Sequence, residues 1–216
     1  NRLARPFAPF SKLAPDQYAV SCKINTRAGS ERIVRAAFDF ARKFKRRKVT
    51  VVHKANVVRA TDGLFLDAAK EVASRYPEIQ MDDANIDAMT MWLLKNPFNY
   101  DVLVAPNLYG DIISDLCAQM VGGLGFGCSG NIGAKLAVFA PTHGSAPKYA
   151  GLDKVNPIAT ILAAKMMLDW LGESDKGSAL ERAVAAVIQE GTIRTYDMNG
   201  SNTTTEMAQA IASKLG

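Results

Sequence analysis

The sequence predicts an α/β fold with a mostly parallel sheet layered with helices, and three observations lead to this prediction. Short apolar runs rich in β-branched residues alternate with longer stretches of helical period, which is the pattern of β-α-β units. Glycine, proline and polar residues separate the two kinds of segment, as turns require. Apolar residues make up 48% of the 216 positions and charged residues 22%, a composition that can form a core and excludes a disordered chain.

Each element follows from a local pattern. Val49–His53 is short, β-branched and apolar, as a buried strand is. Asn156 before Pro157 is a cap with proline at the first helical position, and Thr203-x-x-Glu206 matches a capping box. In chain order we expect a helix capped by Ser30 and Glu31 that ends in the basic run 42–48, a strand at 49–53, a helix at 63–75, a strand at 79–81, a helix at 84–95, a strand at 101–105, a helix at 110–121, a glycine-rich passage at 122–133, a strand at 137–140, and helices at 157–171, 179–190 and from 203 on.

Composition and charge exclude several kinds of protein. The most apolar run, Leu116–Gly130, is interrupted by Gln119 and glycines, so we expect no membrane span. Three cysteines provide no disulfide framework, which favours a reducing compartment: the cytoplasm, or the mitochondrial matrix in a eukaryote. The net charge of +5 suits an anionic small molecule as well as a nucleic acid. The basic run 42–48 complements a helix dipole, and since no binding motif lies nearby we expect no nucleic-acid partner.

The first residues differ in character from the rest. Residues 1–15 are basic and carry no acid before position 16, a composition that faintly suggests a targeting segment. Their three prolines would break the amphipathic helix that such a segment needs. We therefore expect an irregular arm at the start of the chain.

Paired acids are the first candidates for chemistry. Asp111 and Asp115 lie four residues apart at the start of a predicted helix and soon after a strand, so their carboxylates project from one face. Like charges placed in this way repel each other unless a cation lies between them, and oxygen ligands favour Mg²⁺ or Mn²⁺. Acids that complement the helix dipole are an equally good interpretation. Asp83 and Asp87 repeat the spacing near another helix, where dipole compensation is the simpler interpretation.

Three further segments could carry chemistry. Lys54 leaves a buried strand end after His53, where partial desolvation favours acid–base use; a lysine that reaches solvent is the alternative. Gly125–Gly130 matches G-x-G-x-x-G but follows a helix, so we interpret it as a helix end and a tight turn rather than a dinucleotide fingerprint. In His143–Tyr149, small residues let backbone N–H groups approach a ligand and Lys148 can meet a phosphate, although an ordinary loop fits equally well.

Together these segments resemble the isocitrate/isopropylmalate dehydrogenase family of metal-dependent β-decarboxylating dehydrogenases. The resemblance runs from about residue 26 to the end of the chain, in the family's order. The Asn-Leu-Tyr-Gly-Asp and His-Gly-Ser-Ala-Pro motifs are very specific to the family. The matching stretches are Gly29–Ile33, Val52–Asn56, Asp62–Phe65, Asn107–Asp115, Val121–Gly125, His143–Gly151 and Asn156–Pro157.

The resemblance implies an architecture. The fold would be that of this family and not a Rossmann fold of the dinucleotide-binding type. Residues 1–28 would form an arm or clasp, residues 29–122 a small dimer-forming α/β domain with the metal site, and residues 123–216 the C-terminal part of a large domain with the cofactor loop. The partner would be a second copy of the chain, in a homodimer with shared active sites.

The resemblance also implies roles for individual residues. Asp111 and Asp115 would bind the metal, with Asp87 completing the site from the neighbouring subunit. Lys54, also reaching across the dimer, would be the acid–base lysine, with Asn56 beside it near substrate and nicotinamide. The residues that would hold the cofactor are His143, Gly144, Ser145, Ala146, Lys148, Tyr149, Asn156 and Tyr196.

The implied reaction has two stages: a hydride leaves a 2-hydroxy acid for NAD(P)⁺, and the metal then favours loss of the β-carboxylate. His53 stands where isopropylmalate enzymes usually carry Asp, which resembles the isocitrate or homoisocitrate side of the family. Lys148 and Tyr149 resemble the pair that contacts the 2′-phosphate in NADP-using isocitrate dehydrogenases. Tyr196 matches a second tyrosine of that site, but Gly200 stands where an arginine is expected.

The leading expectation is therefore oxidation of isocitrate to 2-oxoglutarate with NADP. The alternatives are an NAD-dependent isocitrate or homoisocitrate dehydrogenase, less readily an isopropylmalate dehydrogenase, and a non-catalytic regulatory subunit. The family's usual first strand, its arginine-rich substrate segment and its catalytic tyrosine are not recognisable. We therefore expect a C-terminal portion of a longer protein that is inactive by itself.

Overall fold

A computed structural model describes residues 13–14 and 16–215 of the chain, so the arm or targeting segment expected at the very start lies largely outside the described residues. The chain divides into two compact units, between Tyr109 and Gly110. This division falls inside one helix, Asn107–Met120, so no loop marks it in the sequence. The domain boundary expected after residue 122 stays a prediction.

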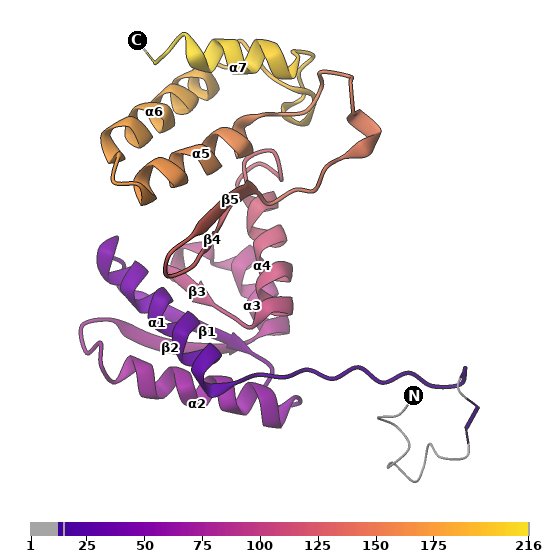
Figure 1. The fold of residues 1–216 in the computed structure, drawn as a ribbon, viewed down its shortest axis with the longest axis vertical. Helices are drawn as coiled ribbons and strands as arrows, with labels where there is room; N and C mark the ends of the chain where they lie inside the picture. Colours follow the sequence, from indigo (N-terminus) through magenta and orange to yellow (C-terminus); the bar gives the residue numbers. More distant parts are fainter. Residues whose placement is uncertain (1–12, 15, 216) are drawn as a thin grey trace. The chain divides into compact units, whose positions relative to one another are not determined.

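A three-stranded parallel sheet in the order β2-β1-β3 organises the first unit (Figure 1). Strand β1 is Lys48–His53, β2 is Gln80–Asn85 and β3 is Val102–Val104. Strand β1 is central and pairs in parallel with both neighbours, with Val51 opposite Asp83 on one side and Val104 on the other. Because parallel strands end at a common edge, the carboxyl end of β1, at His53, lies in the middle of that edge.

Three helices accompany this sheet: α1 (Arg27–Lys43), α2 (Arg59–Ala73) and α3 (Ile86–Lys95), followed by the short 3₁₀ turn η2 (Pro97–Asn99). Helices α1 and α2 pack against each other and against the sheet, as Figure 1 shows. Their apolar faces meet alternate residues of β1 in a single core. The fully or nearly fully buried members of this core are Val34, Phe38, Ala41, Val49, Val51, Phe65, Ala69, Val72, Tyr76, Ile79 and Val104.

The start of α1 differs from the prediction. The helix begins at Arg27, and the Oγ1 atom of Thr26 accepts a hydrogen bond from the N–H of Gly29 at 3.1 Å. Ser30 is therefore not the cap: it lies inside the helix, and its hydroxyl donates to the Thr26 carbonyl at 2.9 Å. Two candidate caps stood close together in the sequence, and the earlier one is used because it leaves a longer helix to pack on the sheet.

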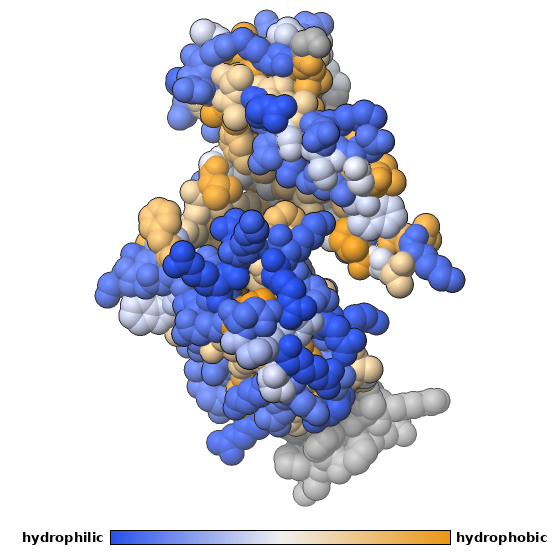
Figure 2. Space-filling model, turned by 90° about the vertical axis from the view of Figure 1, so that its left-hand side faces the viewer, coloured by the Kyte–Doolittle hydropathy of each residue, from blue (hydrophilic) through white to orange (hydrophobic). Residues whose placement is uncertain are grey.

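Two residues of the basic run 42–48, which reaches from the end of α1 to the start of β1, have acidic partners in the same unit. Arg42 donates to Glu78 at 2.8 Å, and Lys48 pairs with Asp82 at 3.0 Å. The face of this unit seen in Figure 2 is mostly hydrophilic. Local ion pairs thus occupy two charges of the run, and the expectation that it has no nucleic-acid partner stays a prediction.

The second unit has an antiparallel hairpin and four helices. Strand β4 (Cys128–Ile132) pairs with β5 (Ala137–Pro141), and helix α4 (Asn107–Met120) precedes them. Helix α5 packs on the hairpin, α6 packs on α5, and α7 packs on α6 (Figure 1). The remaining bounds are η3 Pro147–Tyr149, α5 Ile158–Trp170, α6 Ser174–Glu190, η4 Tyr196–Met198 and α7 Thr204–Ala212. Their common core is Ile158, Ala183, Val184, Val187, Met207 and Ile211.

The interpretation of Gly125–Gly130 as a helix end and a tight turn is wrong for its second half. Cys128–Ile132 is a strand, and Gly130 lies opposite Phe139 in β5. A Cβ at Gly130 would lie 3.1 Å from the Phe139 ring. The glycine thus leaves room for an aromatic side chain across the hairpin, a use that the motif itself does not reveal.

Two predicted helix starts can be compared with the structure. The capping box is confirmed: Thr203 Oγ1 accepts the N–H of Glu206 at 3.1 Å, and the Glu206 carboxylate accepts the N–H of Thr203 at 2.7 Å. Helix α5 begins at Ile158, one residue later than expected, and Asn156 Oδ1 accepts the Ile158 N–H at 3.0 Å. The parallel sheet layered with helices confirms the predicted α/β class. No helix in the described part of the chain is both long and apolar enough to cross a bilayer.

Candidate active site

Lys54 and Asp87, predicted as separate site residues, lie together. Lys54 follows the carboxyl end of β1, and its Nζ forms an ion pair with Oδ1 of Asp87 in the first turn of α3. The Lys54 side chain is 23% exposed and that of Asp87 is 68% exposed. The hydrogen bond from Lys54 is the main cause that holds the pKa of Asp87 below its usual range. The pair sits at the middle of the sheet's carboxyl edge, where ligands of open α/β sheets bind.

The interpretation of Asp83 and Asp87 as two acids on one helix is wrong, because β2 continues to Asn85 and Asp83 belongs to that strand. His53 is buried, and its Nε2 lies 2.9 Å from Oδ2 of Asp83. The N–H of Ala55 donates to His53 Nδ1 at 3.0 Å, so Nδ1 must carry a lone pair and Nε2 the proton donated to Asp83. Asn56 is exposed in the turn that follows.

Asp111 and Asp115 lie on α4, in the second unit. Because α4 begins at Asn107, neither acid is in its first turn, so compensation of the helix dipole does not explain them. Both are exposed, and neither forms a hydrogen bond or an ion pair with any described residue. They are one turn apart on the same face, so their charges repel. Two oxygen ligands of this kind fit Mg²⁺ or Mn²⁺, which often bind one or two carboxylates together with water and substrate.

No three His, Cys, Asp or Glu side chains among the described residues gather to hold a metal ion. Asp87 was expected to reach the metal from a second copy of the chain. That expectation stays a prediction, as does the role of Asn56 beside Lys54.

A pocket of about 730 Å³ in the second unit brings together most of the residues predicted to bind the cofactor. It lies between the glycine-rich segment after α4 and the loops that flank α5 and α7. The residues that line it include Gly122, Gly123, Gly125, His143, Gly144, Ser145, Ala146, Tyr149, Asp153, Lys154, Asn156, Tyr196 and Asp197. Lys148, in η3, is exposed and is not among the residues that line the pocket.

An aromatic pair and a lysine form one end of this pocket. The rings of Tyr149 and Tyr196 lie with their centroids 5.4 Å apart. Lys154 Nζ lies 4.8 Å from the centroid of Tyr196 and 5.6 Å from that of Tyr149. Burial, followed by the hydrogen bond with Tyr149, raises the pKa of Tyr196. The two tyrosines can stack on an aromatic ring of a ligand, and Lys154 can attract an anion.

Asn156 is held from two sides at the pocket wall. It is 4% exposed, its Oδ1 accepts the Ile158 N–H, and its Nδ2 donates to Asp197 Oδ2 at 3.0 Å. Asp197 in turn accepts the Thr195 hydroxyl at 2.5 Å. Gly125 lies against this group, and a Cβ there would come within 2.9 Å of Asn156 Nδ2. The amide is therefore fixed before any ligand arrives.

The loop before η3 is also constrained. Ala146 has φ +46°, a left-handed conformation that is costly for a residue with a Cβ. His143 Nδ1 donates to the carbonyl of Gly144 at 2.8 Å, which holds the ring against the loop. Gly200, where the resemblance led us to expect arginine, packs against the backbone of Arg194, so no side chain fits there without a shift.

Sequence reasoning missed three residues: Lys154 and Asp197 at the pocket, and Asp62, a buried acid that accepts the backbone N–H of Lys54. A lysine three residues after a glycine turn gave no signal of its own, and Asp197 gains its role only from the distant Asn156. Asp62 could have been found, because it begins a stretch that matches the family, yet no role was attached to it.

Known proteins of one family match most of the chain. The model of the isocitrate/isopropylmalate dehydrogenase family matches residues 10–211. The 3-isopropylmalate dehydrogenase of Archaeoglobus fulgidus is 48% identical over 193 residues, which cover 89% of this chain and 59% of that protein. The catalytic subunit 6 of the mitochondrial NAD isocitrate dehydrogenase of Arabidopsis thaliana is 48% identical over 196 residues, which cover 90% of this chain and 52% of that protein.

The crystal structure of isocitrate dehydrogenase from Methylococcus capsulatus superimposes with a TM-score of 0.89 at 44% sequence identity, covering 94% of this chain and 61% of that one. The chain thus spans about half the length of the curated relatives it matches. It belongs to the isocitrate/isopropylmalate dehydrogenase family, a family of oxidoreductases that depend on a divalent metal and a nicotinamide cofactor.

Proposed function

We propose that the protein to which this chain contributes catalyses the oxidative decarboxylation of isocitrate to 2-oxoglutarate with NADP and Mg²⁺ or Mn²⁺. The observation that carries the proposal is the ion pair of Lys54 with Asp87 at the carboxyl end of the central strand. A lysine that is partly buried and held by a carboxylate is placed to give a proton to a substrate at that edge as an ammonium, or to accept one as a neutral amine. The two unpaired carboxylates of α4 supply the hard ligands that the metal needs.

The residues divide the work between them. Asp111 and Asp115 hold the metal, and Asp87 orients the Lys54 ammonium. Lys54 moves the proton, and Asn56 contacts the substrate beside it. The bound metal supplies a Lewis acid and the nicotinamide supplies the hydride acceptor. Binding of the adenosine half falls to the second unit's pocket, with His143–Ala146 and Asn156 as its polar wall.

The choice of NADP rests on the end of that pocket. Lys154 beside the two tyrosines offers a positive charge and hydroxyl groups to a 2′-phosphate. NAD is the second candidate, because the Arabidopsis relative is named an NAD enzyme. A homodimer in which Lys54 and Asp87 serve the partner's metal site remains part of the proposal.

The test uses the protein encoded by the complete gene. We expect turnover of isocitrate only with Mg²⁺ or Mn²⁺, loss of turnover on chelation, and recovery when the metal is restored. Asp111→Asn and Asp115→Asn should each lower kcat/KM by about 10²-fold or more, because each removes a charge from the metal site. Asp67→Asn, the same change at an exposed acid of α2, is the matched control.

The substrate and cofactor are tested in the same assay. Isocitrate, homoisocitrate and 3-isopropylmalate are compared, each with NADP⁺ and with NAD⁺. A higher kcat/KM for another hydroxy acid would replace isocitrate as the proposed substrate, and a higher kcat/KM with NAD⁺ would replace NADP as the proposed cofactor. Turnover that persists in both metal-ligand variants would contradict the metal site, and no turnover of any substrate would favour a regulatory subunit.

A further inference from the structure

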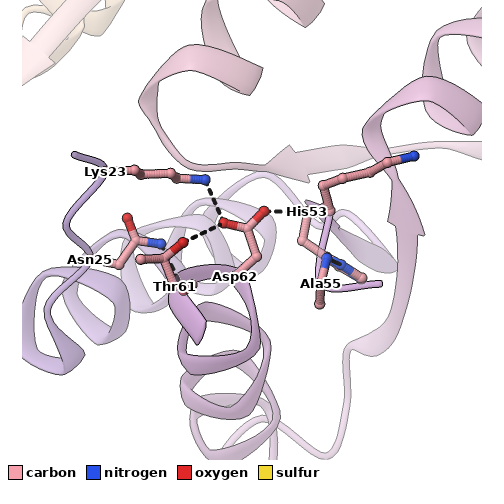
Figure 3. Close-up of polar contacts among 7 residues, drawn as sticks. Lys23, Asn25, His53, Ala55, Thr61 and Asp62 are labelled. Atoms are coloured by element: carbon pink, nitrogen blue, oxygen red, sulfur yellow. Dashed lines mark hydrogen bonds and ion pairs between the residues drawn. The ribbon is translucent and has the colours of Figure 1, made fainter. Parts of the chain in front are cut away.

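Asp62 is a buried carboxylate beside Lys54 that the proposed mechanism leaves without a role. It lies in the first turn of α2, and its side chain is fully buried. Its Oδ2 accepts the backbone N–H of Lys54 at 2.8 Å, and its Oδ1 accepts from Lys23 and, at 3.3 Å, from the Thr61 hydroxyl. Figure 3 shows Asp62 between the segment of Lys23 and Asn25 on one side and the turn after β1 on the other.

The Asp62 carboxylate fixes the point from which the Lys54 side chain departs. The Lys54 carbonyl accepts the N–H groups of Val57 and Val58, at 3.0 Å and 2.8 Å, so the turn is closed on that side. The Lys54 N–H has Asp62 as its acceptor. With the ammonium held by Asp87, Lys54 is restrained at its N–H, its carbonyl and its Nζ. A side chain tethered in this way occupies one position before substrate binds.

The charge on Asp62 is balanced by the segment that precedes α1. Lys23 pairs with Asp62 and lies 4.3 Å from the centroid of the Tyr109 ring. Asn25 Nδ2 donates to the Thr61 carbonyl at 2.9 Å, which anchors the same segment. Burial by itself would raise the pKa of Asp62, but hydrogen bonds from Lys23, the Lys54 N–H and Tyr109 outweigh it, so the pKa is lowered. Asp62 is therefore ionised, which makes it a strong acceptor for the Lys54 amide.

We propose that Asp62 is a positioning residue that fixes the backbone of Lys54 for proton transfer, and that Lys23 is the counter-charge that keeps Asp62 in place. The inference rests on the proposed role of Lys54. Residues 23–25 were expected to belong to an arm. The inference gives them a role in aligning Lys54.

The experiment compares two changes at Asp62 in the protein encoded by the complete gene. Asp62→Asn keeps an oxygen that can accept the Lys54 N–H but leaves Lys23 without a charged partner. Asp62→Leu combined with Lys23→Met replaces both charges by apolar side chains, so that no buried carboxylate is left unpaired, but it leaves the Lys54 N–H without its acceptor. Asp67→Asn on the same helix is the matched control for the first change.

The two variants should rank in opposite orders for stability and turnover. Asp62→Asn should be the less stable protein and keep more of kcat. The double variant should be the more stable one and lose about 10²-fold in kcat with little change in KM, because the reacting group is displaced while substrate contacts remain. Hydrogen exchange of the Lys54 amide should be about tenfold faster in the double variant, and that of Val51 in the core unchanged.

A purely structural role predicts the same order for both properties, and that result would overturn the inference. So would a folded double variant with unchanged kcat or unchanged exchange at Lys54. Lys54→Met separates this failure from that of the proposed function. If Lys54→Met abolishes turnover while the double variant keeps it, only the positioning role is lost; if Lys54→Met leaves kcat unchanged, the role of Lys54 itself is refuted.

Discussion

The wall of the cofactor pocket can be tested by placing the same methyl group at two glycines that both line it. Gly125→Ala puts a Cβ within 2.9 Å of Asn156 Nδ2 and against the Asp197 carboxylate, whereas Gly144→Ala meets nothing within 4 Å. Neither glycine has a positive φ. The two variants therefore differ in the space available and not in backbone strain.

The expected cost at Gly125 follows from the hydrogen bonds that must yield. Moving Asn156 weakens its bond to the Asp197 carboxylate, worth about 1.5–3 kcal/mol, and its bond to the Ile158 N–H, worth about 0.5–1.5 kcal/mol. Replacing glycine by alanine gains about 0.4–1 kcal/mol through the unfolded chain. Gly125→Ala should thus lower the free energy of unfolding by about 1–4 kcal/mol, whereas Gly144→Ala should leave it unchanged or slightly raised.

Two assays check this expectation. Urea unfolding gives the free energy of unfolding of each variant, and calorimetric titration gives the dissociation constant for NADP⁺. Because Asn156 lines the pocket, Gly125→Ala should also raise that constant by about tenfold, equivalent to about 1.4 kcal/mol. Equal stability and equal affinity in the two variants would refute the reasoning that the Asn156–Asp197 contact shapes the pocket.

Two further predictions concern charge. Lys154→Met should weaken NADP⁺ binding by about tenfold and leave NAD⁺ binding unchanged. Lys148→Met should have a smaller effect, because of these two lysines only Lys154 lines the pocket. A larger effect of Lys148→Met in the same titration would contradict this prediction. Asp62 has a lowered pKa in the folded protein, so its contribution to stability is complete above the unfolded pKa of about 3.9 and is lost as the pH falls through the lower folded value. Urea unfolding at pH 5 and pH 3 should show a smaller drop for Asp62→Asn than for the parent, and an equal drop would count against the lowered pKa.

Sequence patterns predicted well those helices and strands whose formation depends on residues close together in the sequence. The apolar, β-branched run Val49–His53 is β1, and the capping box at Thr203 starts α7. Boundaries set by tertiary contacts were missed. Strand β2 extends from the expected 79–81 to Gln80–Asn85 because its polar residues pair with β1, and pairing leaves no mark in the hydrophobic pattern.

The candidate site divides in the same way. Residue type and spacing singled out Lys54, Asp111 and Asp115 but left simpler interpretations open, and the resemblance to the family then favoured a role in chemistry. The ion pair of Lys54 with Asp87 joins residues from different elements, so no spacing rule could reveal it. Lys148 and Lys154 lie in the same loop, and the sequence does not distinguish them. The folded loop shows that Lys154, and not Lys148 in η3, lines the pocket.

The contact between Lys23 and Asp62 has a consequence for how this sequence can vary. The two residues are 39 positions apart in the sequence. Replacing either one leaves the other as a charge without its partner. Single substitutions at either position should therefore be selected against more strongly than the joint replacement of both. Among related sequences we expect the two positions to covary, as an acid with a base or as two uncharged residues.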